Sequence, residues 1–187
     1  DTAVQFISEQ GTKDLSLRKI AQRAGVSHTA PYRHFKGKNA ILAAVAKEGF
    51  DLMLKQTREM IAKSRGNELD HFAIIGLSYI EFAVSCPSHY RVMFGTRGEN
   101  SYLSDAFKPE SIPVFKLLRD TIMACQDKGL LKAGDLQEMT LAAWSIAHGF
   151  AMLRIDHHIP EEKLGEKRLN TLKRSVVMAI FQGLRPE

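Results

Sequence analysis

The sequence is poor in the features that mark several common protein classes. Two cysteines, Cys86 and Cys125, occur among 187 residues, too few for a disulfide framework and not in the spacing of a zinc site. No stretch approaches the roughly 18 consecutive apolar residues of a membrane span. Residues 1–14 lack the basic start and apolar run of a secretory signal. We therefore expect a reduced, cytoplasmic protein with no membrane partner.

Catalytic motifs are missing as well. The patterns GxSxG and HExxH, the P-loop and the dinucleotide-binding glycine pattern do not occur. The run Asp156-His157-His158 contains metal-ligating residue types. Adjacent helical residues, however, point about 100° apart and do not form the i, i+4 pair that a metal requires. We expect no enzyme activity, no cofactor and no metal site.

Positive charge is concentrated in the first third of the chain. The net charge is +5. Residues 1–65 hold 12 Lys and Arg against 6 Asp and Glu, a balance of +6, and residues 66–187 hold 14 against 15, a balance of −1. A basic excess confined to one part favours a polyanionic partner there. The alternative interpretation is a small helical module that merely carries extra basic residues.

Apolar residues recur with a helical period along the chain. No alternating pattern of strands competes with it. The polar segment 95–113 is expected to be a surface connector with a short helix near 102–107. Between the glycine and proline breaks, helices are predicted over 2–9, 16–24, 27–35, 39–63, 68–85, 88–94, 111–129, 135–157 and 161–184.

The stretch that begins at Ser16 has the punctuation of two short crossing helices. Ser16 can cap the first helix, and Ala21 is small where a second helix must cross closely. Gly25 follows the first helix, where a left-handed residue favours glycine. Val26 is expected to fill the gap between the helices and Ser27 to cap the second one. This arrangement is typical of a helix-turn-helix.

The second helix of this pair, predicted over 27–35, presents side chains suited to DNA. Its first turn can reach base edges or fill space beside a thymine methyl. Tyr32 and Arg33 have the reach and the donors for phosphates, and Lys38 stands where the next helix begins. Phe35 is expected to anchor the helix in the core. The candidate DNA-contacting residues are Ser16, Ser27, His28, Thr29, Ala30, Tyr32, Arg33, His34 and Lys38.

The stretch from Phe6 to Val45 resembles the N-terminal DNA-binding domain of the TetR (tetracycline repressor) family of bacterial transcription regulators. The resemblance implies a DNA-binding regulator and says nothing of the regulated gene. The stretch departs from the family at Pro31, which removes one backbone donor early in the second helix. It also lacks the usual basic residues before its first helix, so some phosphate contacts are expected to be missing or to come from residues outside this sequence. The resemblance is carried by Ile20-Ala21, Ala24-Gly25-Val26-Ser27, Tyr32, His34-Phe35 and Lys38.

The C-terminal part resembles a TetR-like subgroup marked by a Trp, His, Gly (WHG) signature. The similar segments are 89–95 and 144–150, and Trp144, His148 and Gly149 carry the signature. The resemblance implies a helical domain that dimerises and senses a small molecule of unspecified identity.

The last two predicted helices, 135–157 and 161–184, are apolar on two faces. A helix of this kind must be covered on both sides, which suits a four-helix dimer interface. A monomeric bundle core is the alternative. In the first of them one stripe is Leu136, Met139, Ala143, Ala147 and Phe150, and the other is Leu141, Trp144, His148, Met152 and Ile155.

A small-molecule site is usually an apolar cavity with a few polar groups. Methionines and aromatic residues at helical spacing also form ordinary packed cores, and His148 would then satisfy a buried hydrogen bond. The candidate lining residues are Phe72, Tyr79, Met93, Phe94, Phe115, Trp144, His148 and Met152.

These patterns predict an all-α protein with a three-helix helix-turn-helix domain at 1–45 and a helical ligand-binding and dimerisation domain at 46–187. We expect a homodimeric regulator, more specifically a repressor, that a small-molecule effector releases from a palindromic double-stranded DNA operator. The competing hypothesis is a helical small-molecule-binding protein or enzyme whose first third only imitates a helix-turn-helix.

Overall fold

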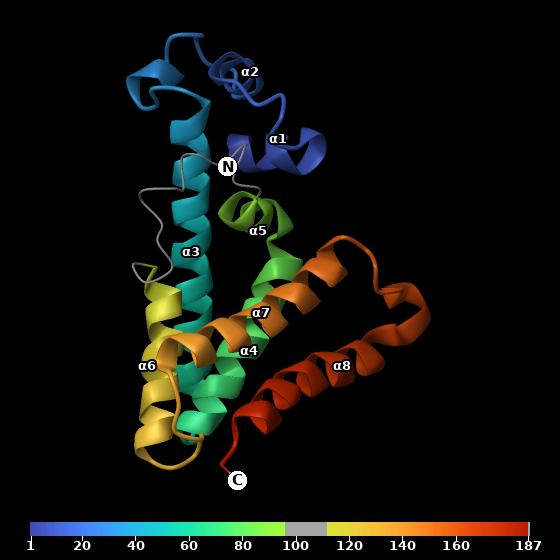
Figure 1. Ribbon diagram of the computed structural model, residues 1–187. Coiled ribbons are helices and arrows are strands. Elements are labelled where there is room, and N and C mark those ends of the chain that lie inside the picture. Colours follow the sequence, from blue (N-terminus) through green and yellow to red (C-terminus); the bar gives the residue numbers. More distant parts are fainter. Residues whose placement is uncertain (96–111, 187) are drawn as a thin grey trace. The chain divides into compact units, whose positions relative to one another are not determined.

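The computed structural model describes residues 1–95 and 112–186. Every regular element in these two ranges is helical (Figure 1), which confirms the predicted all-α class. Most of the connector predicted at 95–113, with its short helix at 102–107, lies outside the described residues. The elements are α1 (Thr2–Gln10), α2 (Leu17–Arg23), a 3₁₀ turn η1 (Pro31–Arg33), α3 (Lys38–Lys63), α4 (Glu68–Ser85), α5 (Pro87–Phe94), α6 (Pro113–Asp127), α7 (Leu136–Ile155) and α8 (Glu161–Leu184).

The chain forms two compact units. The first consists of Asp1–Leu52 and Cys86–Ile112, and the second of Met53–Ser85 and Pro113–Glu187. The long helix α3 contributes residues to both units. Helix α5 belongs to the first unit although it follows α4 in the sequence.

The core of the first unit lies among α1, α2, the first part of α3 and α5. Helix α1 contacts both α2 and α5, and Phe6 and Ala21 are buried. Gly49 of α3 faces α5, where a Cβ atom would clash with the Met93 side chain. This glycine therefore permits the close approach of the two helices.

Helix α4 is the central element of the second unit, and it contacts α6, α7 and α8 (Figure 1). Two fully buried hydroxyls join α3 to α4: Thr57 Oγ1 lies 2.8 Å from Ser78 Oγ. Thr57 also donates to the Met53 carbonyl at 2.8 Å. These partners remove the cost of burying polar groups between two apolar helices.

Helix α8 differs from the uninterrupted helix predicted over 161–184. Gly165 has φ +69° and ψ 159° and breaks the helical path near its start. Glycine adopts this conformation without the steric cost that a Cβ atom would bring.

No single helix within 1–95 and 112–186 is long and apolar enough to cross a membrane. Only the bent pair of α4 and α5 reaches that length and composition when its two parts are taken together.

Candidate DNA-binding surface and ligand cavity

The first helix of the predicted helix-turn-helix begins as the sequence indicates. Ser16 has extended backbone angles, and its hydroxyl accepts a hydrogen bond from the Lys19 amide at 3.3 Å. This bond satisfies one of the amides that a helix leaves free at its N-terminus. Leu17 and Ala21 bury the inner face of α2 at 4% and 0% exposure. The N-cap predicted at Ser16 is confirmed.

Gly25 makes the corner after α2. Its φ of +67° is left-handed, and its amide donates to the Gln22 carbonyl at 3.2 Å. The next amide, of Val26, donates to the Ala21 carbonyl at 3.0 Å. These two bonds form a Schellman motif, which satisfies the last carbonyls of the helix. The prediction that glycine turns this corner is confirmed.

The second helix predicted over 27–35 is much shorter in the structure. Residues 28–30 form turns, and only Pro31–Arg33 form a 3₁₀ turn. In an α-helix capped by Ser27, the amide of residue 31 would bond to the Ser27 carbonyl, and proline has no such amide. The Ala30 amide takes this carbonyl instead, at 3.0 Å, which is the tighter 3₁₀ pattern.

Three expectations about this region need correction. The Ser27 hydroxyl does not cap a helix but lies 3.2 Å from the Thr29 hydroxyl. Val26 is 47% exposed and fills no gap, because the short 3₁₀ turn does not form the helix against which it would pack. Phe35, expected as a core anchor, is half-buried.

Most candidate DNA-contacting side chains lie on the surface of the first unit. Tyr32 is 61% exposed, and Ser16, Ala30 and Lys38 are half-buried. The Lys38 ammonium donates to the Lys13 carbonyl at 2.9 Å, so it already holds α3 to the segment before α2. The remaining exposed candidates are Ser27, His28, Thr29, Arg33 and His34.

One basic side chain beside this surface is already neutralised. Arg23 forms a forked hydrogen bond and ion pair with Glu9, and one of its two contacts measures 2.8 Å. The hydrogen bond from Arg23 lowers the pKa of Glu9. The pair joins α1 to the end of α2, so its role is to hold the module together.

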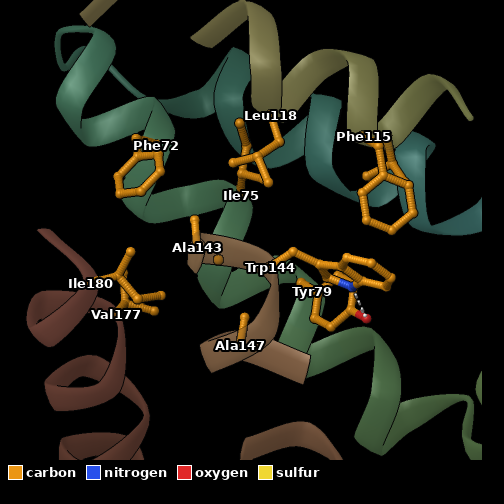
Figure 2. A pocket seen from close by; sticks show the side chains of 12 residues that line it. Phe72, Ile75, Tyr79, Phe115, Leu118, Ala143, Trp144, Ala147, Val177 and Ile180 are labelled. Carbon is orange, nitrogen blue, oxygen red and sulfur yellow. Dashed lines mark hydrogen bonds between the residues drawn. The ribbon is translucent and has the colours of Figure 1, made fainter. Parts of the chain in front are cut away.

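A small apolar cavity lies inside the second unit, between α4, α6, α7 and α8 (Figure 2). Its volume is about 30 Å³, so in this conformation side chains nearly fill it. The Phe115 and Trp144 rings meet edge to face, with their centroids 4.7 Å apart. The lining residues are Phe72, Ile75, Gly76, Tyr79, Val114, Phe115, Leu118, Ala143, Trp144, Ala147, Val177 and Ile180.

A chain of hydrogen bonds forms the polar edge of this cavity. The Trp144 indole N–H donates to the Tyr79 hydroxyl at 2.9 Å (Figure 2), and this hydroxyl lies 2.9 Å from His148 Nδ1. Because an indole N–H only donates, the Tyr79 oxygen accepts there and its own proton is available to His148. Burial lowers the pKa of His148, which keeps the imidazole neutral near pH 7.

The structure places the predicted cavity residues in three groups. Four of them, Phe72, Tyr79, Phe115 and Trp144, line the cavity. His148 joins it through Tyr79, and Met152, on the same helix, is half-buried but not part of the lining. The last two predicted residues are Met93 and Phe94.

Met93 and Phe94 belong to α5 in the first unit and are not among the cavity residues. Met93 is 3% exposed and lies against Gly49. The Phe94 ring lies 5.6 Å from the ring of Phe50. Met93 therefore belongs to the core of the first unit, and half-buried Phe94 packs beside Phe50 in the same unit.

Sequence reasoning missed the small and aliphatic part of the lining. Ala143 and Ala147 belong to a buried i, i+4 series on α7 that includes Ala151. This spacing was visible in the sequence and could have nominated them. No sequence pattern could have assigned Val177 and Ile180 of α8 to the cavity. Helical periodicity predicts that a face is apolar but not which neighbouring helix it contacts.

Two observations on the described residues concern metal binding and the reactivity of Cys125. No group of three His, Cys, Asp or Glu side chains within 1–95 and 112–186 is placed to hold a metal ion. Cys125 is buried, and burial raises the pKa of its thiol to about 11. A thiol that stays protonated at neutral pH is a poor nucleophile.

Two family models match this sequence. The model of bacterial regulatory proteins of the tetR family matches residues 1–45. The model of the tetracyclin repressor-like C-terminal domain matches residues 72–173.

Several solved structures share the fold of this chain. A protein of unknown function from Rhodococcus sp. RHA1 is 25% identical, with a TM-score of 0.77 over 98% of this chain and 92% of that one. A TetR family transcription regulator from Marinobacter aquaeolei VT8 is 12% identical, with a TM-score of 0.77 over 100% and 93% of the two chains. The fatty acid degradation regulator FadR from Bacillus halodurans is 18% identical, with a TM-score of 0.72 over 100% and 94%.

The C-terminal family model alone covers more than half of the 187 residues. The N-terminal model covers α1, α2, η1 and the start of α3, where the capped helix and the glycine corner lie. Regulators of this family bind operator DNA, dimerise and bind small-molecule effectors, and the family is not one of enzymes. The chain belongs to the TetR family of bacterial transcription regulators and carries the DNA-binding helix-turn-helix of that family.

Proposed function

We propose that this regulator is a repressor and that a small-molecule effector releases it from its operator. Residues 1–45 serve as the DNA-binding domain, and residues 46–187 bind the effector and dimerise. The observation that carries the proposal is the corner after α2, where Gly25 ends the helix in a Schellman motif. Beyond this corner the side chains of Ser27, His28 and Thr29 are exposed. The DNA-binding role places the protein in the cytoplasm with the chromosome.

The proposed DNA contacts fall into two classes. Ser27, His28, Thr29 and Ala30 reach base edges in the major groove, as the first turn of a recognition element does. Exposed Tyr32, together with Arg33, His34, Lys38 and Ser16, contacts phosphates. Lys38 exchanges its hydrogen bond with the Lys13 carbonyl for a phosphate oxygen. The contribution of Lys38 to the free energy of DNA binding is therefore smaller than that of a lysine whose ammonium is fully hydrated before it binds.

The proposed dimer interface is a face of α7 and α8 that carries exposed apolar side chains. Three apolar residues of α7 are exposed, Leu141 at 55%, Ile146 at 44% and Leu153 at 48%, and Met178 of α8 is exposed at 47%. Gly149 lies on the same side of α7, and a Cβ atom there would meet nothing within 4 Å. Glycine inside a helix is destabilising, and a second copy that packs closely on this face would explain it.

The proposed effector site is the cavity lined by Phe72, Tyr79, Phe115 and Trp144, with His148 as the partner of Tyr79. A ligand that enlarges this cavity displaces helices of the second unit, and α3 connects that unit to the DNA-binding domain. A dimer reads two half-sites about 34–36 Å apart, so a change in the separation of its two DNA-binding domains weakens operator binding. The ligand must bind one of these separations more tightly than the other.

DNA binding is tested by fluorescence anisotropy with a labelled duplex of random sequence at several salt concentrations. Affinity should fall steeply as salt rises, because basic residues release counterions from DNA. Lys38→Gln should lower the slope of log affinity against log salt by about one. Lys163→Gln, on the first turn of α8, is the control and should leave the slope unchanged. Affinity that ignores salt would contradict the proposal and favour a helical small-molecule-binding protein without DNA binding.

A further inference from the structure

The cavity of the second unit is uncharged over its whole described lining. Its walls consist of aliphatic and aromatic side chains with two alanines and a glycine. The polar atoms that its lining side chains contribute are the Tyr79 hydroxyl and the Trp144 N–H, which bond to each other at 2.9 Å. The walls therefore offer a ligand apolar contact and weak hydrogen bonding.

The imidazole beside the cavity adds no positive charge. His148 Nδ1 lies 2.9 Å from the Tyr79 hydroxyl, and burial favours the uncharged form of the ring. His148 therefore offers no cation to which a carboxylate or phosphate could bind.

Two ion pairs of the second unit lie outside the lining of this cavity. Lys173 of α8 donates to Glu81 of α4 at 2.6 Å, and Lys128 donates to Glu68 at 2.5 Å. Glu81 and Lys173 line a different hollow, an open groove of about 700 Å³ that also includes Lys167 and Arg174. The second unit thus keeps a charged groove and an uncharged cavity as distinct sites.

We infer that the ligand of this cavity is an electrically neutral, largely apolar molecule with at most one weakly polar group, such as an alcohol or an ester. The inference rests on the effector-binding role proposed above. An ion in this cavity would lose its hydration and find no opposite charge among the described lining residues, which strongly disfavours binding. A neutral ligand avoids this cost and gains from the burial of its own apolar surface.

Trp144 makes the test specific, because it is the only tryptophan in the chain and it lines the cavity. Its fluorescence is titrated near neutral pH with 1-octanol, octanoate and octylammonium, which share one chain length and differ in charge. We expect a saturable change with 1-octanol and affinities at least about ten-fold weaker for both ions. Equal or tighter binding of either ion, or a saturable change with none of the three, would overturn the inference.

A matched pair of variants locates the binding site. Ala147→Leu fills the cavity and should abolish the response to 1-octanol. Ala44→Leu makes the same change at an exposed position of α3 and should leave the response intact. A 1-octanol response that survives Ala147→Leu in a protein with normal circular dichroism would place binding outside the cavity. The titration with the three probes uses the unaltered protein, so it tests the inference even if the Ala147→Leu variant does not fold.

Duplex binding measured on the same preparation separates this inference from the proposed function. Salt-dependent duplex binding together with preference for an ion would overturn the ligand class and leave the regulator standing. Binding of 1-octanol without any duplex binding would support the ligand class and overturn the proposed DNA-binding role.

Discussion

The indole nitrogen of Trp144 on α7 lies 2.9 Å from the hydroxyl oxygen of Tyr79 on α4. Sixty-five positions separate the two residues in the sequence. Their hydrogen bond joins the two helices at the edge of the cavity, which both residues line (Figure 2). Trp144 and His148 therefore both form hydrogen bonds with the hydroxyl of one tyrosine on another helix.

Removal of this hydroxyl should destabilise the second unit. Tyr79→Phe keeps the ring but removes the acceptor for Trp144 and the partner of His148. We expect a loss of about 1 kcal/mol in the free energy of unfolding, the usual net value of a hydrogen bond in a protein. The measurement is urea denaturation followed by circular dichroism. Tyr32→Phe, at a side chain that is 61% exposed, is the control and should stay within about 0.5 kcal/mol of the parent.

Stability should fall as the pH drops below neutral because of His148. Burial lowers its folded-state pKa below the ordinary value of 6.5, so in acid the unfolded chain binds the proton more readily. The contribution of the neutral imidazole is fully present above about pH 6.5 and is lost as the pH falls through the folded-state pKa. The measurement is the urea midpoint of unfolding as a function of pH in this interval, for the parent protein and for His148→Gln. The midpoint should decline less with falling pH in the variant. An equal decline would assign the pH dependence to other groups.

The two serines of the helix-turn-helix should differ in their effect on stability. Ser16 caps α2 through the Lys19 amide, and Ser16→Ala should cost about 1 kcal/mol of unfolding free energy. The described hydrogen bond of Ser27 is to the Thr29 hydroxyl, on the surface. Ser27→Ala should therefore change stability little, although it should weaken operator binding. Thermal denaturation without DNA separates the two effects.

A charge introduced on the exposed face of α7 should disrupt the dimer. Ile146→Asp introduces a charge where we propose that a second copy packs, and it should shift the protein from dimer to monomer in sedimentation velocity experiments. Met123 of α6 has a similar exposure, 47% against 44% for Ile146, but lies outside the proposed interface. Met123→Asp should leave the mass unchanged. A dimer that tolerates Ile146→Asp would place the interface elsewhere.

Local interactions explain why the helices and the corner could be predicted from the amino acids alone. The cap at Ser16 and the left-handed Gly25 depend on residues within a few positions of each other, and glycine tolerates the positive φ that such a corner requires. The family resemblance of the first 45 residues follows from the same local pattern. Pro31 is the instructive exception. The sequence shows its missing amide, but a 3₁₀ turn replaces the predicted helix because the Ala30 amide bonds to the Ser27 carbonyl instead.

Contacts between distant segments could not be predicted in this way. Periodicity shows which side of a helix is apolar, but the same apolar side can pack against any neighbour that fits. Met93 and Phe94 have the residue types predicted for the cavity, but α5 packs in the first unit, where Gly49 makes room for it. Ala147 and Val177 became part of the cavity wall only through the packing of α7 and α8 on α4. The order of residues thus specifies the helices and their caps, whereas side-chain shape in three dimensions selects which of their faces enclose a site.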